Sequence, residues 1–348
     1  MLDSLRELLK SPGLKQRLIL MAALILVFHA VVIFLVLSQA SGYPTLLGLA
    51  ILAYGLGLRH SVDPDHIAAI DNTTRKLMQD GKKPVGVGFF FALGHSSIVI
   101  VMCMLVAVSA SFVNDMLPVY KETGVLVSSL ASCFFLLAIG FINLFVLVDT
   151  FKTWRKLVRG DHPHDLTLEE YLSTGGLLAR ILKPVLNMVG SSWSMYWVGL
   201  LFGLGFDTAS EVALLGMSGS TGVSSMPLSV ILTIPLAFTV GMTLIDTLDG
   251  ILMLGAYGWA FLKPARKLYY NVTITFTSVL IALFIGGIEG LQIISKHTGA
   301  TGWLWDFANG LELENWGFYI IGIFVVSWSA SMLLYRLRGY DSLTERKP

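Results

Sequence analysis

The chain has 348 residues, enough for two ordinary soluble domains, but 55% of them are hydrophobic and only 14% are charged. Soluble globular proteins carry roughly a quarter charged residues, so this composition excludes an ordinary soluble protein and predicts an all-α membrane protein. The net charge of +1 gives no indication of a nucleic-acid partner, and the two cysteines, Cys103 and Cys133, exclude a disulfide framework or a cysteine-based zinc site.

Apolar segments of about 20 residues are long enough to cross a bilayer as helices, and they predict eight transmembrane helices. The first is too long for the core of a signal peptide and has no small-residue cleavage site after it, so it is predicted to be the first membrane helix. The whole chain, 1–348, is predicted to be a single integral-membrane domain. The predicted spans are 18–38, 44–70, 85–109, 124–148, 192–217, 227–260, 271–294 and 316–335.

The distribution of lysine and arginine predicts the orientation. All but three of the 24 basic residues precede the first span or follow an even-numbered span; the exceptions are Arg59, Lys121 and Lys296. Basic residues concentrate on the cytoplasmic side of membrane proteins, so both termini and the long connection at 149–191 are predicted to be cytoplasmic. That connection contains His162 and His164. Histidines in exposed loops more often have no metal than form a metal site, so this is the favoured interpretation of both residues.

The second span contains an unusually dense set of ionisable side chains, which inside a membrane indicate function by default. They are Arg59, His60, Asp63, Asp65 and His66. On an ideal helix, His60, Asp63 and His66 fall along one arc while Asp65 points elsewhere. Pro64 lacks an N–H and clashes with the carbonyl of His60. A kink at Pro64 would turn Asp65 inward and free that carbonyl as a further ligand.

Three other spans carry polar or acidic groups. In the third span, the sequence does not decide whether His95 is a metal ligand or a contact between helices. In the fifth span, Asp207 and Glu211 lie four residues apart and share one helix face. In the sixth span, Asp246 and Asp249 lie three residues apart.

The second, fifth and sixth spans therefore combine six acids with a single base. A pocket this negative at membrane depth is stable only when it holds protons, cations or both. Imidazole with carboxylate suits a first-row divalent ion, whereas all-oxygen sites suit magnesium or calcium. The histidines thus favour nickel, cobalt, zinc or manganese, and the remaining acids are candidates for orienting histidines or carrying protons.

The charged spans are sequence neighbours, the second with the third and the fifth with the sixth. The loop charges place the second and fifth spans in opposite orientations. Inverted repeats of this kind are a recurrent transporter design, with the substrate site between the repeats near mid-membrane. The glycine-rich, acid-bearing stretches at 57–66 and 203–211 are the predicted pair of broken helices.

Four motifs in chain order resemble the signatures of the nickel/cobalt transporter (NiCoT) family. The hallmark of that family, a histidine followed after four residues by Asp-His, is matched by His60, Asp65 and His66, and the match continues through Ala68-Ala69-Ile70-Asp71-Asn72-Thr73. The other three motifs are Phe91-Ala92-Leu93-Gly94-His95-Ser96-Ser97, Gly205-Phe206-Asp207-Thr208-Ala209-Ser210-Glu211 and Gly241-Met242-Thr243-Leu244-Ile245-Asp246-Thr247-Leu248-Asp249. The sequence departs from many members, which have alanine, at Ser61 and Pro64.

The resemblance implies high-affinity uptake of Ni²⁺, sometimes with Co²⁺, across a bacterial cytoplasmic membrane. It implies that the histidines and aspartates of the second span handle the metal, which is a transported substrate and not a cofactor. Metal preference in the family is associated with the first two helices, so His29 and Val62 are our candidates for tuning it.

Two alternatives remain at this stage. The sequence does not fix the direction of transport, so export of the same ions stays open. An intramembrane zinc hydrolase using Ser96, Asp63 and the histidines is a weaker alternative, because the chain has no His-Glu-x-x-His motif. The absence of a P-loop sequence argues against direct ATP use, and no ATPase subunit is evident in this chain. A secondary permease is therefore the favoured interpretation.

Overall fold

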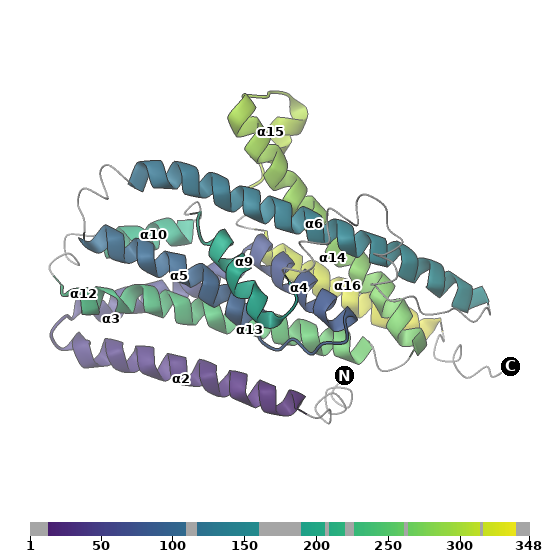
Figure 1. Ribbon diagram of the computed structural model, residues 1–348, viewed down its shortest axis with the longest axis horizontal. Helices are drawn as coiled ribbons and strands as arrows, with labels where there is room; N and C mark the ends of the chain where they lie inside the picture. Colours follow the sequence, from purple (N-terminus) through teal and green to yellow (C-terminus); the bar gives the residue numbers. More distant parts are fainter. Residues whose placement is uncertain are drawn as a thin grey trace.

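The computed structural model describes residues 13–108, 117–159, 189–205, 209–219, 226–260, 264–313 and 316–338, and within these ranges all regular secondary structure is helical (Figure 1). The helices are α2 (Leu14–Ala40), α3 (Thr45–His60), α4 (Pro64–Gln79), α5 (Val87–Val108), α6 (Leu117–Arg159), a 3₁₀ turn η2 (Ser192–Ser194), α9 (Met195–Phe202), α10 (Ala209–Ser218), α12 (Leu228–Ile231), α13 (Thr233–Ala260), α14 (Pro264–Thr298), α15 (Trp303–Asn309) and α16 (Gly317–Leu337).

Six helical stretches in the described residues are long and apolar enough to cross a membrane, or seven when the bent pair α3–α4 counts as one span. The predicted all-helical class is thus confirmed, with six to seven candidate membrane spans in the described residues. The predicted fifth span, 192–217, is divided between α9 and α10, each too short to cross a bilayer by itself.

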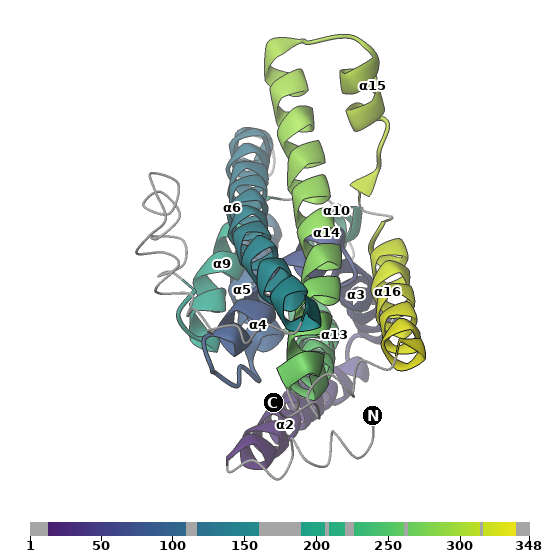
Figure 2. The ribbon, with the colours of Figure 1, turned by 90° about the vertical axis from the view of Figure 1, so that its right-hand side faces the viewer.

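Helix α13 lies at the centre of the bundle, packed against α3, α4 and α5. The long helices α6 and α14 pack against each other, and Figure 2 shows α14 extending out of the bundle with α15 folded back beside its end. The side-chain amide of Gln292 on α14 donates to the carbonyls of Ala308 (2.8 Å) and Leu311 (3.1 Å) and so fixes this hairpin. The start of α2 and the end of α16 lie at the same end of the bundle (Figure 1).

The predicted second span is not one kinked helix but two helices bent by 57°. Helix α3 ends at His60, and Pro64 occupies the first position of α4, where a missing N–H leaves no helical hydrogen bond unmade. The Ser61 hydroxyl donates to the carbonyls of Gly57 and Met242, both at 3.0 Å, and ties the break to α13. The His60 carbonyl accepts the Asp63 N–H at 3.0 Å, so Pro64 does not leave this oxygen without a hydrogen bond.

Helix α4 continues to Gln79, beyond residue 70, where the predicted second span ends. Arg75 is fully buried on α4, with its Nη2 3.1 Å from Oδ2 of Asp71 and 3.3 Å from Oδ1 of Asn72. The buried Lys76 donates from Nζ to the Val189 carbonyl at 2.7 Å. These two basic residues therefore have structural partners, and their positive charge is not that of an exposed loop.

Helices α3 and α13 cross with their backbones in contact at two glycines. A Cβ added at Gly57 would overlap the carbonyl oxygen of Phe238, and one added at Gly241 would overlap the carbonyl oxygen of Tyr54. Small residues permit such close approach of membrane helices. On α3, Gly57 comes three residues after Tyr54, and on α13, Gly241 comes three residues after Phe238. The carbonyl of each aromatic residue contacts the glycine of the other helix.

The same arrangement recurs where α5 crosses α9. A Cβ at Gly94 would overlap the carbonyl oxygen of Tyr196, and one at Gly199 would overlap that of Phe91. The glycines again follow the aromatic residues by three positions. Two separate helix crossings thus share one local sequence pattern and one backbone contact.

Candidate metal centre

Three buried histidines converge at the break between α3 and α4. His60 is the last residue of α3, His66 lies in the first turn of α4, and His95 lies on α5. Their ring centroids are 4.8 to 5.0 Å apart, and one nitrogen from each ring lies within 4.8 Å of the other two. Residues far apart in the sequence therefore form one compact group of imidazoles.

Two of these rings are held by carboxylates. Nδ1 of His60 lies 2.9 Å from Oδ2 of Asp63, and Nδ1 of His66 lies 3.3 Å from Oδ2 of Asp246 on α13. A neutral imidazole that donates from Nδ1 has its lone pair on Nε2. Carboxylates in this position fix the tautomer and orientation of metal-binding histidines. Asp246 thus directs the Nε2 lone pair of His66 toward the other two rings, and Asp63 lies close enough to the ring of His60 to hold it in place.

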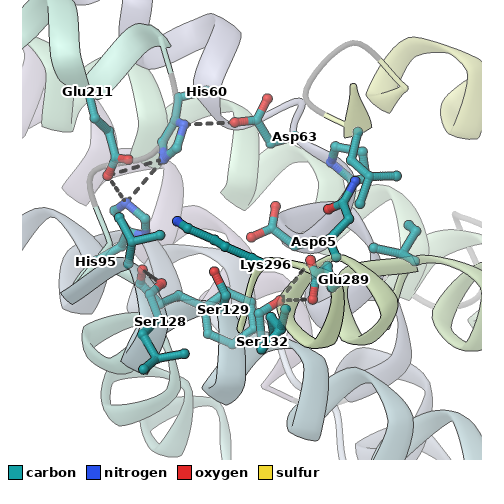
Figure 3. Close-up of a pocket in the computed structure, with 18 of the residues that line it drawn as sticks. His60, Asp63, Asp65, His95, Ser128, Ser129, Ser132, Glu211, Glu289 and Lys296 are labelled. Atoms are coloured by element: carbon teal, nitrogen blue, oxygen red, sulfur yellow. Dashed lines mark hydrogen bonds and ion pairs between the residues drawn. The ribbon is translucent and has the colours of Figure 1, made fainter. Parts of the chain in front are cut away.

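Glu211 on α10 adds a carboxylate to the same group. Its Oε1 lies 3.0 Å from Nε2 of His95 and 3.8 Å from Nε2 of His60, and these two nitrogens are 3.1 Å apart (Figure 3). Arg59 donates to Oγ of Ser210 at 2.8 Å and so holds α10 beside α3. The end of α3 therefore positions both a histidine and the helix that carries Glu211.

The Nε2 atom of His66 is buried and has no hydrogen-bond partner among the described residues. Aromatic rings pack around the histidines, with the Phe91 ring 4.8 Å from that of His66 and the Phe238 ring 5.6 Å from that of His60, centroid to centroid. A buried polar atom normally has a partner. A cation among the histidines would give this nitrogen one.

The donor set indicates the class of cation. Three imidazole nitrogens and a carboxylate oxygen suit a first-row divalent metal, whereas magnesium and calcium prefer all-oxygen sites. The arrangement fits Ni²⁺ or Co²⁺ on donor chemistry.

A cavity of about 760 Å³ leads to this group, lined at one end by His60, His95 and Glu211. Asp65, which an ideal helix would have directed elsewhere, lies in the cavity wall (Figure 3). Its Oδ1 accepts the backbone N–H of His66 at 3.0 Å. The break before α4 changes the direction of the helix and brings Asp65 to the same cavity as the histidines.

Most of the site residues predicted from the sequence lie at this group or in its cavity. The structure brings together His60, Asp63, His66, His95, Glu211 and Asp246, with Asp65 in the cavity wall and Arg59 as a support.

Other candidates lie apart from the histidines or outside the described residues. Asp249 is on α13 and within electrostatic range of Asp71 and Asp246. His29 bonds the Ile25 carbonyl of its own helix at 2.8 Å, and the Val62 backbone lies against Gly317 of α16. Asp207, His162 and His164 fall outside the part of the chain that the structure describes.

Two charged residues of the cavity were missed in the sequence. Glu289 lies inside the predicted seventh span, where an acid is itself a signal of function, and its carboxylate accepts two contacts from the Ser132 hydroxyl at 2.9 and 3.1 Å. Lys296 follows the same span and lines the cavity. No sequence signal relates Lys296 to the histidines, because only the packing of α14 places it there.

Comparison with known proteins gives a consistent result. The family described as high-affinity nickel-transport protein matches residues 46–334. The chain is 47% identical to a high-affinity nickel transport protein of Cupriavidus necator over 94% of both chains. It is 41% identical to the nickel transporter NixA of Staphylococcus aureus, over 90% of this chain and 93% of that one. It is 37% identical to the cobalt transport protein NhlF of Rhodococcus rhodochrous, over 93% and 94%. No solved structure matches the chain significantly.

Proposed function

The chain belongs to the family of high-affinity nickel-transport proteins, and from this premise we propose that it imports Ni²⁺ across the bacterial cytoplasmic membrane as a secondary permease. Co²⁺ is the alternative substrate, in keeping with the similarity to a cobalt transport protein. The observation that carries the proposal is the buried group of His60, His66 and His95, with one nitrogen of each within 4.8 Å of the others.

Each polar residue of the group has a role in this proposal. The three imidazoles and Glu211 bind the ion after it loses water, and Asp63 and Asp246 hold the rings of His60 and His66 in the binding orientation. Asp65 receives the ion in the cavity. Asp207 and Asp249 are proposed as supporting acids on its path, and His29 and Val62 as residues that tune metal preference.

The membrane potential is a sufficient driving force. A divalent cation entering a cell gains about 4.6 kcal/mol for each 100 mV of inside-negative potential. This corresponds to an accumulation on the order of a thousandfold. Neither ATP hydrolysis nor coupling to protons is required by the proposal.

We propose eight transmembrane helices, with α9 and α10 together forming the fifth span and α3 and α4 the second. Exposed apolar side chains on the outer helices, such as Leu26, Phe34 and Val326, support contact with lipid. The start of α2 and the end of α16 lie at one end of the bundle (Figure 1). This common end supports placing both termini on one side of the membrane, and the basic residues near the termini and in the 149–191 connection support the cytoplasmic side for all three.

The two glycine crossings support an inverted repeat that pairs the second and third spans with the fifth and sixth. The first helix of each unit crosses the second helix of the other, α3 on α13 and α9 on α5. Superposing the Tyr54–Gly57 pattern of α3 on the Tyr196–Gly199 pattern of α9 brings Asp65 into register with Asp207. The first helix of each unit is interrupted, α3 after His60 and α9 after Phe202.

Uptake of radioactive Ni²⁺ into proteoliposomes tests the proposal. With an inside-negative potential, we expect saturable uptake at submicromolar Ni²⁺ in the presence of excess Mg²⁺, with competition by Co²⁺. Vesicles without protein provide the baseline. Efflux without influx would favour an exporter, and no movement of Ni²⁺ in either direction would reject the proposed function.

Replacing Asp246 with asparagine tests how His66 is held. The asparagine side chain would still fill the space, but the charge that stabilises the ring of His66 is lost, and carboxylates of this kind contribute about 10- to 100-fold to metal affinity. We expect the KM for Ni²⁺ in the Asp246→Asn variant to rise within that range. The control is Asp306→Asn on the exposed helix α15, which we expect to leave KM unchanged. An unchanged KM in both variants would contradict the orienting role.

A further inference from the structure

A link of three residues, 61–63, joins the two helices that carry His60 and His66. His60 ends α3 and His66 lies in the first turn of α4, so the direction in which this link turns sets the separation of the two rings. The link also contains Asp63, whose carboxylate lies 2.9 Å from Nδ1 of His60. Any contact that fixes the link therefore fixes part of the metal group.

The link is held between α13 and α16. On one side, the Ser61 hydroxyl donates to the Met242 carbonyl of α13 at 3.0 Å. On the other side, α16 begins with Gly317, which is buried against the backbone of Val62. A Cβ added at Gly317 would overlap the Val62 carbonyl oxygen and would lie 2.6 Å from the carbonyl carbon. Among the described glycines, no other added Cβ would come as close to an atom of a neighbouring segment.

The start of α16 is itself fixed by its neighbours. The ring of Trp316, the residue before Gly317, lies 5.5 Å from that of Phe284 on α14, centroid to centroid. One turn later, Ile320 is 3% exposed and belongs to the same apolar core as Ile67 of α4. Figure 1 shows α16 alongside α4, against which it packs. A side chain at position 317 would therefore displace the link as well as α16.

The position of the link bears on which metal is bound. Proteins select among first-row divalent metals by site geometry and ligand type more than by raw affinity. Zn²⁺ has no geometric preference from its d electrons, whereas Ni²⁺ with nitrogen and oxygen ligands favours square-planar or tetragonal sites. A change in the spacing of His60 and His66 should thus weaken the binding of Ni²⁺ more than that of Zn²⁺.

We propose that Gly317 is a positioning residue for the metal group. By leaving room for the Val62 carbonyl, it sets the bend between α3 and α4, and thereby the spacing of His60 and His66 and the preference for Ni²⁺. This inference rests on the proposed function, because the group that Gly317 positions is the proposed Ni²⁺ site. It also gives Val62 a physical means of tuning metal preference, through the contact of its backbone with α16.

Uptake of radioactive Ni²⁺ with Zn²⁺ as competitor tests the inference. We expect Gly317→Ala to raise the KM for Ni²⁺ at least about tenfold, the lower end of the effect of residues that support metal ligands. The inhibition constant of Zn²⁺ should rise less, so that the ratio of the two constants shifts in favour of Zn²⁺. Gly322→Ala changes the same helix where an added Cβ has no atom within 4 Å, and both constants should match the wild type.

Gly140→Ala separates positioning from a general loss of stability. At Gly140 on α6, an added Cβ would lie 2.9 Å from Cδ2 of Leu283 on α14, so we expect a lower melting temperature. The KM for Ni²⁺ and the inhibition constant of Zn²⁺ should nevertheless stay at the wild-type values. A Gly317→Ala variant that melts lower but keeps both wild-type constants would overturn the inference, because the contact would then serve the fold alone.

A milder pair of variants gives the answer if Gly317→Ala fails to insert. Ile320→Val trims the buried face of α16 one turn after Gly317, and Ile323→Val trims a side chain that is 47% exposed. We expect only Ile320→Val to raise the ratio of the Ni²⁺ KM to the Zn²⁺ inhibition constant, by about twofold or more, as for a buried methyl group removed. Equal ratios in these two variants would overturn this inference alone. Absence of Ni²⁺ uptake by the wild type would overturn the proposed function and this inference together.

Discussion

Loss of His66 is expected to reduce high-affinity Ni²⁺ uptake at least about a hundredfold, the upper end of what a carboxylate behind a metal-binding histidine contributes. Nε2 of His66 is buried without a hydrogen-bond partner among the described residues, and the other ring nitrogen is held by Asp246. Removing the ring takes away one of three imidazoles and leaves no substitute donor at that position. The measurement is initial uptake of radioactive Ni²⁺ at submicromolar concentration by cells that contain equal amounts of inserted protein.

The choice of substitution separates a missing ligand from a destabilised protein. His66→Ala also leaves the buried Asp246 without its partner, which is destabilising. His66→Asn retains an amide N–H for Asp246 but has no atom in the place of Nε2, so we expect near-normal melting and equally low uptake. His162→Ala, in the predicted 149–191 connection, is the control histidine and should retain Ni²⁺ uptake. Normal uptake by His66→Asn would show that the metal is bound elsewhere.

The sequence was sufficient to locate the apolar helices along the chain and to identify His60 and His66 as candidate metal ligands. Spans such as 85–109 and 316–335 coincide with α5 and α16 within a few residues, because length and hydropathy alone determine whether a helix crosses a bilayer. His60 and His66 stand out because ionisable groups are rare in such spans. Their convergence with His95, which follows His60 by 35 residues, depends on packing that no local pattern records.

The break at Pro64 shows where helical geometry misleads. An ideal helix through the whole second span separates Asp65 from the histidines, but the chain starts a new helix at Pro64, which brings Asp65 to the cavity. Helix α13 also shows where local sequence does not decide which residue reaches the site. Asp246 and Asp249 have identical side chains and lie about one turn apart on this helix. Only the position of α4 against α13 decides that Asp246 meets His66.

Gly57→Ala is expected to lower the melting temperature of the purified protein by about 5–10 °C, in line with overpacking that costs roughly 3 kcal/mol. The added Cβ would overlap the carbonyl oxygen of Phe238, and a backbone atom has no alternative rotamer by which to move away. Helices α3 and α13 would have to separate. Because α3 carries His60 and α13 carries Asp246, the metal group would be disturbed together with the fold.

Two further alanines make the comparison specific. Gly55→Ala changes the same helix two residues earlier, where an added Cβ has no atom within 4 Å, and we expect it to melt like the wild type or slightly higher, because alanine is the better helix former. Gly199→Ala places a Cβ against the carbonyl of Phe91 at the crossing of α5 and α9. If the two units are related by an inverted repeat, Gly57→Ala and Gly199→Ala should destabilise the protein to a similar extent. Equal melting of Gly57→Ala and Gly55→Ala would contradict backbone contact between α3 and α13. A stable Gly199→Ala beside an unstable Gly57→Ala would instead indicate that only one of the two crossings holds the histidines in place.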